Sequence, residues 1–457
     1  MKYDAIIIGS GQGGNPLAQR LASRGQSVAL VESNHLGGTC INTGCTPTKA
    51  MVASAQVAHY ARNAGRWGVH AGNVEIDLPA ILERKSKIVE EFRSGWQKSI
   101  DKQKNWHFYR GRARFVRPKQ IQVEKETLEA DHIFIDTGAS PTIPRISGLD
   151  SIPYLTNVSL LELRELPEHL VVLGGGYVGL EFGQMFRRFG SAVTIIQRPE
   201  RILPNEDDDI AAELQRNLES EGIEILLNAR ATEVGGGKNN EITLNLQVSG
   251  GTQTISGSHL LVATGRTPNT RDLDLDKAGV RVDEKGFIVV NERLETSAPG
   301  IWALGDVNGG PAFTHISYND FQIVYGNLIE GKNLSTASRL VPYAVYTDPQ
   351  LGRVGLTEKA ARASGHKLKI GKIEMSHVAR AIERAETQGL MKVVIDAATD
   401  RLMGAAILSA EGGELIQILS TLMLADKPYT LLKGAIYIHP TLAEGFFGLM
   451  ESVKPVD

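Results

Sequence analysis

Short apolar runs alternate with glycine-rich turns and longer amphipathic stretches along the first two thirds of the chain. Residues 4–8 form such a run, a glycine turn follows at 9–14, and a stretch with helical periodicity leads to a second apolar run that ends at Glu32. This order predicts a strand, a turn, a helix and a strand. Residues 170–197 repeat the order around a second glycine turn at 174–179. Both G-x-G-x-x-G motifs therefore have the strand–turn–helix context that is typical of dinucleotide binding.

A second pair of matching segments supports the repeat. Residues 132–138 and 259–265 are both apolar strands that start at a histidine, end in Thr-Gly (Thr137-Gly138 and Thr264-Gly265) and are followed by a proline. Two units of the same kind predict two Rossmann-like nucleotide-binding domains in an α/β chain.

The pattern changes after about residue 337. Residues 390–395 and 402–408 predict two antiparallel strands around a turn at Asp400, and residues 414–425 predict a helix. This part has no phosphate-binding signature, so we expect a separate α+β domain.

Composition narrows the class of protein. A chain of 457 residues suggests about three domains, and 42% hydrophobic with 22% charged residues is typical of globular proteins. A net charge of −3 gives no reason to expect a nucleic-acid partner. No apolar run approaches the roughly 18 residues of a membrane span, and the start does not resemble a signal peptide. We therefore expect a cytoplasmic protein with no membrane partner, in which two cysteines only five positions apart are catalytic or metal-binding.

The first glycine turn has the residues that a dinucleotide requires. Gly9 permits the tight turn, Gly11 lets the backbone approach a pyrophosphate, and Gly14 lets the helix pack on the strand. Glu32 follows at the spacing of a carboxylate that accepts hydrogen bonds from a ribose. The alternative is an ordinary glycine turn with a surface glutamate.

The second turn, Gly174, Gly176 and Gly179, differs at the position of Glu32. Gln197 stands there, with Arg198 and Arg201 close behind. A carboxylate would repel a 2′-phosphate, whereas arginines bind one, so we expect NADPH to be preferred and NADH to be accepted less well. The alternative is two solvated arginines on a loop.

The segment Gly37-Gly38-Thr39-Cys40-Ile41-Asn42-Thr43-Gly44-Cys45-Thr46-Pro47-Thr48-Lys49 has the strongest chemical pattern. In a regular helix, residues five apart have Cα atoms roughly 8.6 Å apart, whereas a disulfide tolerates about 6.8 Å. Pairing Cys40 with Cys45 therefore requires a distorted helix start, which Gly44 and Pro47 permit. A helix N-terminus would also make a thiolate available.

This string resembles the redox-active site of the class I pyridine nucleotide-disulfide oxidoreductases, which include dihydrolipoamide dehydrogenase, glutathione reductase and mercuric reductase. The resemblance extends over essentially the whole chain. Ala303-Leu304-Gly305-Asp306 is similar to the second FAD motif of the family, and Ala263-Thr264-Gly265-Arg266 and His439-Pro440-Thr441-x-x-Glu444 match as well.

The resemblance implies roles for individual residues. Cys40 is the thiol that meets substrate, and Cys45 is the charge-transfer thiol against the flavin. Lys49 lies near the flavin and pairs with Glu181, while Tyr177 covers the nicotinamide site. His439, oriented by Glu444, is the acid/base and comes from the other subunit of a homodimer. The remaining implied cofactor-binding residues are Gly38, Thr39, Thr137, Gly138, Gly265, Gly305 and Asp306.

These inferences give one expected architecture and activity. FAD is expected on residues 1–147 and 276–336, the nicotinamide nucleotide on 148–275, and the dimer interface on 337–457. Electrons are expected to pass from NADPH through FAD and the Cys40–Cys45 disulfide to a small disulfide or another thiol-reactive oxidant.

No named branch of the family fits in full. The segment Tyr346-Thr347-Asp348-Pro349-Gln350 resembles the mercuric reductase branch. However, the chain has no cysteines beyond Cys40 and Cys45 for handing over Hg(II), and no metal-capturing domain is expected. It also has His439, at a position where mercuric reductases depart from histidine. Dihydrolipoamide dehydrogenase typically has an acidic residue where Gln197 stands. A reductase of Hg(II) or Cu(II), and a dihydrolipoamide dehydrogenase subunit of an acyl-transfer complex, remain the alternatives.

Overall fold

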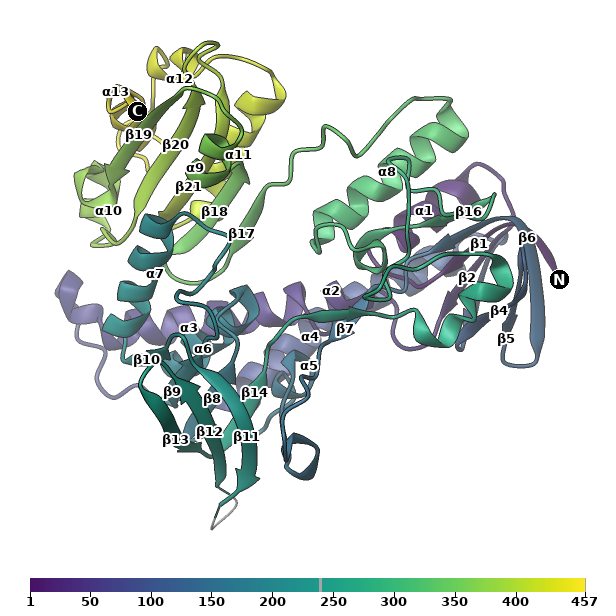
Figure 1. Ribbon diagram of the computed structural model, residues 1–457, viewed down its shortest axis with the longest axis horizontal. Helices are drawn as coiled ribbons and strands as arrows, with labels where there is room; N and C mark the ends of the chain where they lie inside the picture. Colours follow the sequence, from purple (N-terminus) through teal and green to yellow (C-terminus); the bar gives the residue numbers. More distant parts are fainter. Residues whose placement is uncertain (238–240, 457) are drawn as a thin grey trace. The chain divides into compact units, whose positions relative to one another are not determined.

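The computed structural model describes residues 1–237 and 241–456. The chain divides into two compact units, each made of three segments. Unit 1 comprises Met1–Ala50, Pro79–Thr142 and Gly265–Arg339, and unit 2 comprises Met51–Leu78, Ile143–Thr264 and Leu340–Asp457. The mixed α/β class that the repeat predicts is confirmed in both units (Figure 1).

A seven-stranded sheet forms the centre of unit 1. Its parallel part has the order β3-β2-β1-β6-β16, and β5 and β4 extend it beyond β6 as antiparallel strands. Ile6 and Ile8 face one buried cluster while Ala5 and Ile7 face the other, so the central strand is covered on both sides. The strands are β1 (Lys2–Ile8), β2 (Val28–Glu32), β3 (Trp106–Arg110), β4 (Ala113–Arg117), β5 (Gln120–Val123), β6 (Glu126–Ile135) and β16 (Ile301–Ala303), with a separate pair β7 (Ala139–Pro141) and β15 (Arg266–Pro268).

The helices of unit 1 include the two that follow glycine segments. They are α1 (Gly14–Ser23), α2 (Gly38–Asn42), the start of α3 (Cys45–Arg62), α4 (Leu78–Asp101) and α8 (Thr314–Glu330), with 3-10 turns η4 (Arg271–Leu273), η5 (Leu275–Ala278) and η6 (Gly305–Asn308).

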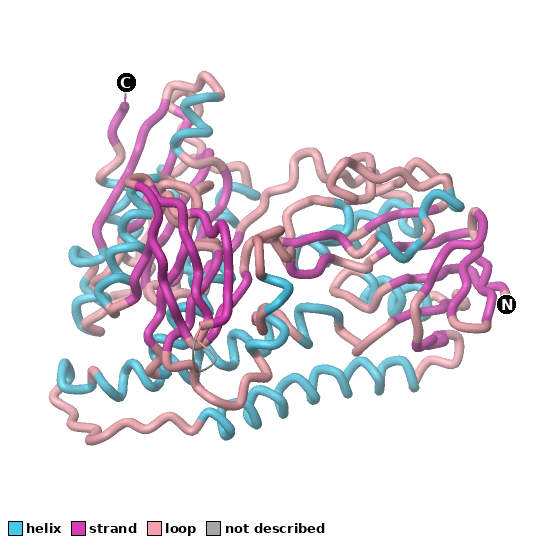
Figure 2. The backbone as a smooth tube through the Cα atoms, turned by 60° about the horizontal axis from the view of Figure 1, so that its bottom comes forward, coloured by secondary structure: helices cyan, strands magenta, loops and turns pink. Residues whose placement is uncertain are grey.

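The nucleotide-binding repeat of unit 2 is a four-stranded parallel sheet of order β10-β9-β8-β14. An antiparallel sheet of order β11-β12-β13 belongs to the same unit. Figure 2 shows these strands in magenta. The elements are β8 (His169–Leu173), α6 (Tyr177–Phe189), β9 (Ala192–Ile196), α7 (Asp208–Ser220), β10 (Ile223–Leu226), β11 (Arg230–Gly236), β12 (Ile242–Val248), β13 (Gly251–Gly257) and β14 (His259–Val262), with α5 (Asn157–Leu160), η1 (Ala64–Trp67) and η2 (Leu149–Ser151).

The C-terminal part of unit 2 is an antiparallel sheet of order β17-β18-β21-β20-β19-β22. The two strands predicted around Asp400 are confirmed as β20 and β21, and the predicted helix is α11. The strands are β17 (Tyr343–Val345), β18 (Gln350–Gly355), β19 (Leu368–Glu374), β20 (Leu390–Asp396), β21 (Leu402–Ser409) and β22 (Lys454–Val456), and the helices are α9 (Glu358–Ala363), η7 (Met375–His377), α10 (Ala379–Glu383), α11 (Gly412–Leu424), α12 (Thr430–Lys433) and α13 (Gly445–Glu451).

Within the described ranges, no helix is both long enough and apolar enough to cross a membrane.

Candidate functional site

The two cysteines lie on either side of a break between two helices. Cys40 is in α2, Thr43 leaves the helical conformation with φ −144° and ψ 15°, and Cys45 is the first residue of α3. Both cysteines are thiols in the structure, and the Cys40 thiol is hydrogen bonded to the Cys45 side chain. The predicted distortion of the helix start is thus present, and it brings the two sulfur atoms together.

Two glycines make this packing possible. A Cβ atom on Gly44 would lie 2.9 Å from the carbonyl oxygen of Thr39, so only glycine lets the second helix begin so close to the first. Gly38 has a φ of +60°, and its Cβ would lie 2.8 Å from the Cα of Gly11. The cysteine segment is therefore packed directly against the first glycine turn.

The sulfur pair has a third polar neighbour that sequence reasoning missed. The hydroxyl of Thr314, the first residue of α8, lies 3.2 Å from the Cys45 sulfur. The same hydroxyl is hydrogen bonded to Cys40. The hydrogen bond to Cys45 and burial raise the pKa of the Cys40 thiol, whereas Thr314 and Lys49 act against that rise. The reduced pair therefore keeps a proton on Cys40 more readily than an isolated thiol would.

The first glycine turn is tightly closed. A Cβ on Gly9 would lie 2.2 Å from the backbone oxygen of Asp136, and one on Gly14 would lie 2.4 Å from the oxygen of Gly9. The Glu32 carboxylate accepts hydrogen bonds from the Ser10 backbone N–H at 3.0 Å and from its hydroxyl at 2.7 Å. Glu32 thus lies beside the turn, where the sequence predicts a ribose-binding carboxylate.

The second FAD motif faces the same turn. Gly305 has a φ of +68°, and its Cβ would lie 3.0 Å from a carboxylate oxygen of Asp136. Asp306 is 3.3 Å from Arg266, and burial raises the pKa of Asp306 despite this arginine. The Thr137 hydroxyl donates to the backbone oxygen of Asn269, and Gly138, with a φ of +64°, accepts from the Asn269 N–H. The structure therefore brings the Thr-Gly and Gly-Asp motifs to the first turn.

The second glycine turn has nearly the same contacts as the first. A Cβ on Gly174 would lie 2.4 Å from the oxygen of Ala263, and one on Gly179 would lie 1.9 Å from the oxygen of Gly174. Gln197 accepts a hydrogen bond from the Gly175 N–H at 2.8 Å. Gln197 thus occupies the place that Glu32 has in the first turn, without its charge.

The two predicted arginines of this turn differ in their surroundings. Arg198 is exposed, whereas Arg201 is half-buried and contacts Asp208. The Gln197 amide donates to the backbone oxygen of Arg201 at 3.1 Å, which ties the loop to the glycine turn.

Three further candidate residues lie close to these motifs in the chain. Lys49 is half-buried in the first turns of α3, in unit 1. Tyr177 begins α6 and is 36% exposed, and Glu181 on the same helix is buried and accepts from the Tyr346 N–H at 2.9 Å. Glu181 belongs to unit 2, so its pairing with Lys49 stays a prediction.

His439 and Glu444 are brought together as the sequence predicts. Nδ1 of His439 lies 2.9 and 3.1 Å from the two carboxylate oxygens of Glu444. The histidine side chain is 66% exposed, and its neighbours Ile436 and Ile438 are 100% and 78% exposed. The carboxylate fixes the ring so that Nε2 points away from Glu444 as the free donor or acceptor.

A thiol pair beside a dinucleotide turn, a second such turn and a histidine–carboxylate pair indicate a two-nucleotide redox enzyme. The profile described as "Pyridine nucleotide-disulphide oxidoreductase" matches residues 3–320, and that of its dimerisation domain matches residues 341–448. The chain belongs to the pyridine nucleotide-disulphide oxidoreductase family.

Curated relatives from three branches of the family are similar over nearly the whole chain. A probable pyridine nucleotide-disulfide oxidoreductase, RclA of Escherichia coli, is 37% identical and covers 99% of this chain and 100% of its own. A dihydrolipoyl dehydrogenase of Thermus scotoductus is 38% identical, covering 99% and 97%. A mercuric reductase of Lysinibacillus sphaericus is 35% identical, covering 97% and 81%.

Solved structures of the same family are similar to this chain over nearly its whole length. The HOCl-induced flavoprotein disulfide reductase RclA of Escherichia coli has a TM-score of 0.90 and 36% identity, covering 99% of this chain and 100% of that one. A Cu(II) complex of the same reductase also has a TM-score of 0.90. The expected family, fold class and reaction class are therefore confirmed: the protein is a flavoprotein oxidoreductase that uses FAD and NAD(P)H.

The residues of the first turn fit FAD. Side chains at Gly9, Gly11 and Gly14 would have no room on the inner side of the turn. The ten-residue helix α1 begins there, and its N-terminus has the partial positive charge that favours a pyrophosphate.

No metal site is evident in the part of the chain that the structure describes, since it has no group of three or more His, Cys, Asp or Glu side chains arranged to bind an ion.

Proposed function

We propose that the protein carries electrons from NADPH through FAD to the Cys40–Cys45 pair and then to a small disulfide or another thiol-reactive oxidant. FAD, when bound, accepts a hydride from the nucleotide and returns two electrons to a disulfide. The observation that carries the proposal is the hydrogen-bonded thiol pair on the broken helix start, packed against the first glycine turn.

The residues of the pair have different tasks in this proposal. Cys45 is the thiol next to the flavin, and Cys40 is the thiol that attacks the substrate. A disulfide substrate accepts two electrons, its sulfur–sulfur bond breaks, and each leaving sulfur takes one proton. His439 supplies and removes these protons at Nε2, while Glu444 fixes its tautomer.

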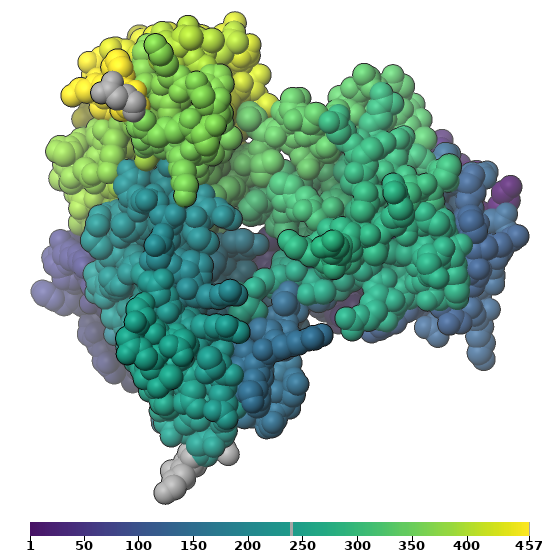
Figure 3. Space-filling model, viewed as in Figure 1, coloured from purple at the N-terminus to yellow at the C-terminus, as the bar shows by residue number. Residues whose placement is uncertain are grey.

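We propose further that the active enzyme is a homodimer whose C-terminal domain carries the interface. The family match to a dimerisation domain supports this, as do the exposed side chains of Ile436 and Ile438, which precede His439 in the chain. The yellow C-terminal segment in Figure 3 is at the surface of unit 2. His439 would then serve the cysteine pair of the partner subunit. The domain boundaries 1–147 with 276–336, 148–275 and 337–457, and a cytoplasmic location, stay predictions.

Steady-state assays identify the acceptor. NADPH oxidation is measured with lipoamide, glutathione disulfide, Hg(II) and Cu(II), for the wild type and His439→Ala. Proton delivery contributes roughly 100-fold or more to such reactions, so we expect disulfide turnover to fall by at least that factor in the variant. Metal-ion reduction should fall much less.

A metal-ion reductase is the second candidate, because mercuric reductases are 35% identical over 97% of the chain and a relative's structure holds Cu(II). Efficient turnover of Hg(II) or Cu(II) by the wild type, with no disulfide accepted, would establish it. A third outcome, high activity with lipoamide alone, would favour a dihydrolipoamide dehydrogenase subunit.

Spectroscopy tests the assignment of the two thiols. Two-electron reduction should produce the long-wavelength absorption of a thiolate next to flavin, and Cys45→Ser should abolish it. The assignment is reversed if Cys40→Ser removes the band and Cys45→Ser leaves it.

A further inference from the structure

A buried carboxyl group lies beneath the FAD turn and has no part in the electron route. Asp136 follows β6, and one of its oxygens accepts a hydrogen bond from the Gly14 N–H at 2.6 Å. The Gly13 N–H is a second donor to the carboxyl group. Cβ atoms on Gly11 and Gly305 would lie 2.7 and 3.0 Å from its two oxygens. Asp136 therefore touches both segments that hold FAD.

The internal repeat shows that this carboxyl group is not needed to build such a turn. The second copy of the strand and Thr-Gly segment has Ala263 at the corresponding position, and its glycine turn closes with the same contacts. Asp136 is thus an addition to the FAD copy alone.

The charged groups that act most strongly on Asp136 are other carboxylates, and the nearby arginines pair with those carboxylates. Asp306 and Asp320 both disfavour its ionised form, and Asp320 accepts from the Gly305 N–H at 2.8 Å. Arg266 pairs with Asp306, and Arg339 pairs with Asp320. Among the described residues, no cation forms an ion pair with Asp136. Burial, above all, raises the pKa of Asp136 well above its usual value, although the Gly14 and Gly13 amides act against the rise.

We propose that Asp136 is a positioning residue of the FAD site that is protonated when FAD is bound. At pH values at which Asp136 is ionised without FAD, it takes up one proton as FAD binds and releases it as FAD leaves. A pyrophosphate bound at the glycine turn would add negative charge near Asp136, so an ionised Asp136 would repel it. A neutral carboxyl group still accepts from the Gly14 N–H and adds no charge. Binding of FAD therefore raises the pKa of Asp136 further.

The sign of the pH dependence follows from this coupling. FAD affinity is highest below the pKa that Asp136 has without FAD, and it falls as pH rises above that value. The fall is up to about tenfold per pH unit for one proton, and it ends above the pKa that Asp136 has with FAD bound.

The test measures FAD release from the holoenzyme. Wild type, Asp136→Asn and Asp131→Asn holoenzymes are diluted in series between neutral and alkaline pH, and the fluorescence of free FAD gives the dissociation constant. Asp131 is an exposed carboxylate on β6 and serves as the matched control. We expect dissociation constants that rise with pH for the wild type and Asp131→Asn, and little change for Asp136→Asn, which should retain FAD better than the wild type at alkaline pH.

A parallel pH dependence for wild type and Asp136→Asn would overturn the proposal. Infrared spectra give a second readout: wild-type holoenzyme labelled with ¹³C-aspartate should have a shifted carboxylic-acid C=O band at neutral pH that is weaker in Asp136→Asn. A band of equal strength in the variant would belong to Asp306, the other buried aspartate with a raised pKa. Either that result or the absence of any such aspartic acid band would also overturn the proposal. If Asp136→Asn does not fold, Asp136→Ala replaces it, because the second repeat has alanine at the corresponding position, Ala263.

Discussion

The redox pair depends on single side chains that come from distant parts of unit 1. Cys40 and Cys45 are five positions apart, but Thr314, which contacts both, is 269 positions from Cys45. A hydroxyl that donates to a thiolate favours the ionised form, and the hydrogen bond with Thr314 acts to lower the pKa of Cys40. A residue outside the cysteine motif therefore helps to set the acidity of the pair.

Thr314→Val should make the Cys40 thiol of the reduced enzyme less acidic. Loss of the hydroxyl removes an interaction that lowers the pKa of Cys40, so less thiolate is present at a given pH. We expect alkylation of the reduced enzyme to slow severalfold near neutral pH, with the rate profile moved to higher pH. Thr314→Ser keeps the hydroxyl and should behave like the wild type; equal slowing in both variants would mean that packing, not the hydrogen bond, is responsible.

Nucleotide preference is also predicted to depend on a few side chains. Charge-assisted hydrogen bonds contribute roughly 1.5–3 kcal/mol each before desolvation, so the arginines behind Gln197 are expected to favour NADPH by tenfold or more in kcat/KM. Replacing Arg198 and Arg201 with alanine should remove this preference by weakening NADPH while leaving NADH nearly unchanged. Equal kcat/KM for the two nucleotides in the wild type would mean that the arginines are surface charges only.

At the scale of elements, the break between α2 and α3 is the feature on which the site depends. The break places Cys45 at a helix start and Cys40 one short helix away. It requires glycine at position 44, because a side chain there would lie too close to the Thr39 carbonyl oxygen.

Gly44→Ala should therefore destabilise unit 1. The added methyl group would meet the Thr39 oxygen at 2.9 Å, and such overpacking costs about 1–3 kcal/mol. The urea midpoint of the holoenzyme measures the effect. Gly95→Ala is the matched control: Gly95 is exposed within α4 with open space around its Cβ, so alanine should stabilise by about 0.5–1 kcal/mol. A Gly44→Ala enzyme as stable as the wild type would show that the break accommodates a side chain.

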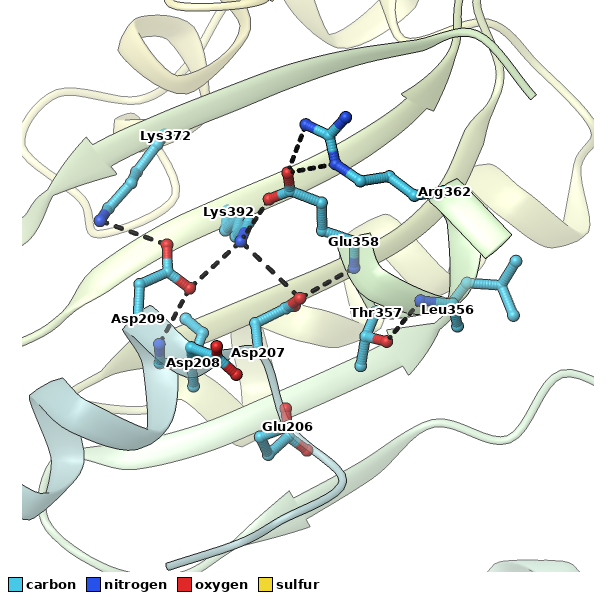
Figure 4. A network of polar contacts seen from close by, with 12 residues as sticks. Glu206, Asp207, Asp208, Asp209, Leu356, Thr357, Glu358, Arg362, Lys372 and Lys392 are labelled. Carbon is cyan, nitrogen blue, oxygen red and sulfur yellow. Dashed lines mark hydrogen bonds and ion pairs between the residues drawn. The ribbon is translucent and has the colours of Figure 1, made fainter. Parts of the chain in front are cut away.

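A buried ion network joins α7 to the C-terminal sheet within unit 2 (Figure 4). Lys392 on β20 is 2.8 Å from Glu358 and 3.1 Å from Asp209, with Asp207 at 3.7 Å. Arg353 on β18 pairs with Asp207 and Glu206. Glu206 and Asp207 end the loop that begins at Gln197, so the C-terminal sheet holds one end of that loop.

Lys392→Met should cost about 1.5–3 kcal/mol at pH 7, because it removes the buried cation that three carboxylates share. The cost stays below that of an orphaned charge, since Asp207 keeps Arg353, Asp209 keeps Lys372 and Glu358 keeps Arg362. Burial alone would raise the pKa of Asp209, but Lys392 and Lys372 hold it below its usual value. An aspartate in the unfolded chain has a pKa of about 3.9. The lowered pKa of Asp209 therefore stabilises the folded protein at pH values above about 3.9, and this contribution is lost as the pH falls below that value through the folded-state pKa. Urea unfolding from pH 7 downward should show a weaker acid dependence in the variant. Lys372→Met, which removes a half-exposed pair, should cost about 1 kcal/mol or less.

The sequence predicted elements better than it predicted contacts between them. Both strand–turn–helix repeats, the two strands around Asp400 and the helix break at Gly44 follow from local rules: apolar runs, glycine positions and the reach of a disulfide. His439 and Glu444 are close in the chain, so their contact was also predictable. Thr314, Asp136 and the partners of Lys392 were not, because each contact depends on how segments far apart in sequence pack, and no local pattern marks it.

At the scale of the whole molecule, the proposed dimer would complete each active site with residues from both subunits. The exposed His439, held by Glu444 and preceded in the chain by the exposed Ile436 and Ile438, is the observation behind this proposal. A two-fold symmetric interface gives two equivalent composite sites.

Mixed dimers test this arrangement. Dimers of Cys40→Ser with His439→Ala subunits, purified by two different tags, should contain one intact site and recover about half of the wild-type disulfide activity. Each variant alone should have very little. Heterodimers that form but have no activity would place His439 in the site of its own subunit.

The matched geometry of the two glycine turns has a consequence for how the enzyme changes over generations. Glu32 and Gln197 occupy the same place and accept the same kind of hydrogen bond from the turn backbone. Glutamine and glutamate codons are separated by a single base, and the exchange at position 197 keeps the acceptor oxygen that Gly175 requires. If position 197 sets the nucleotide preference as predicted, one base change would move the enzyme between NADPH and NADH as electron source without rebuilding the fold.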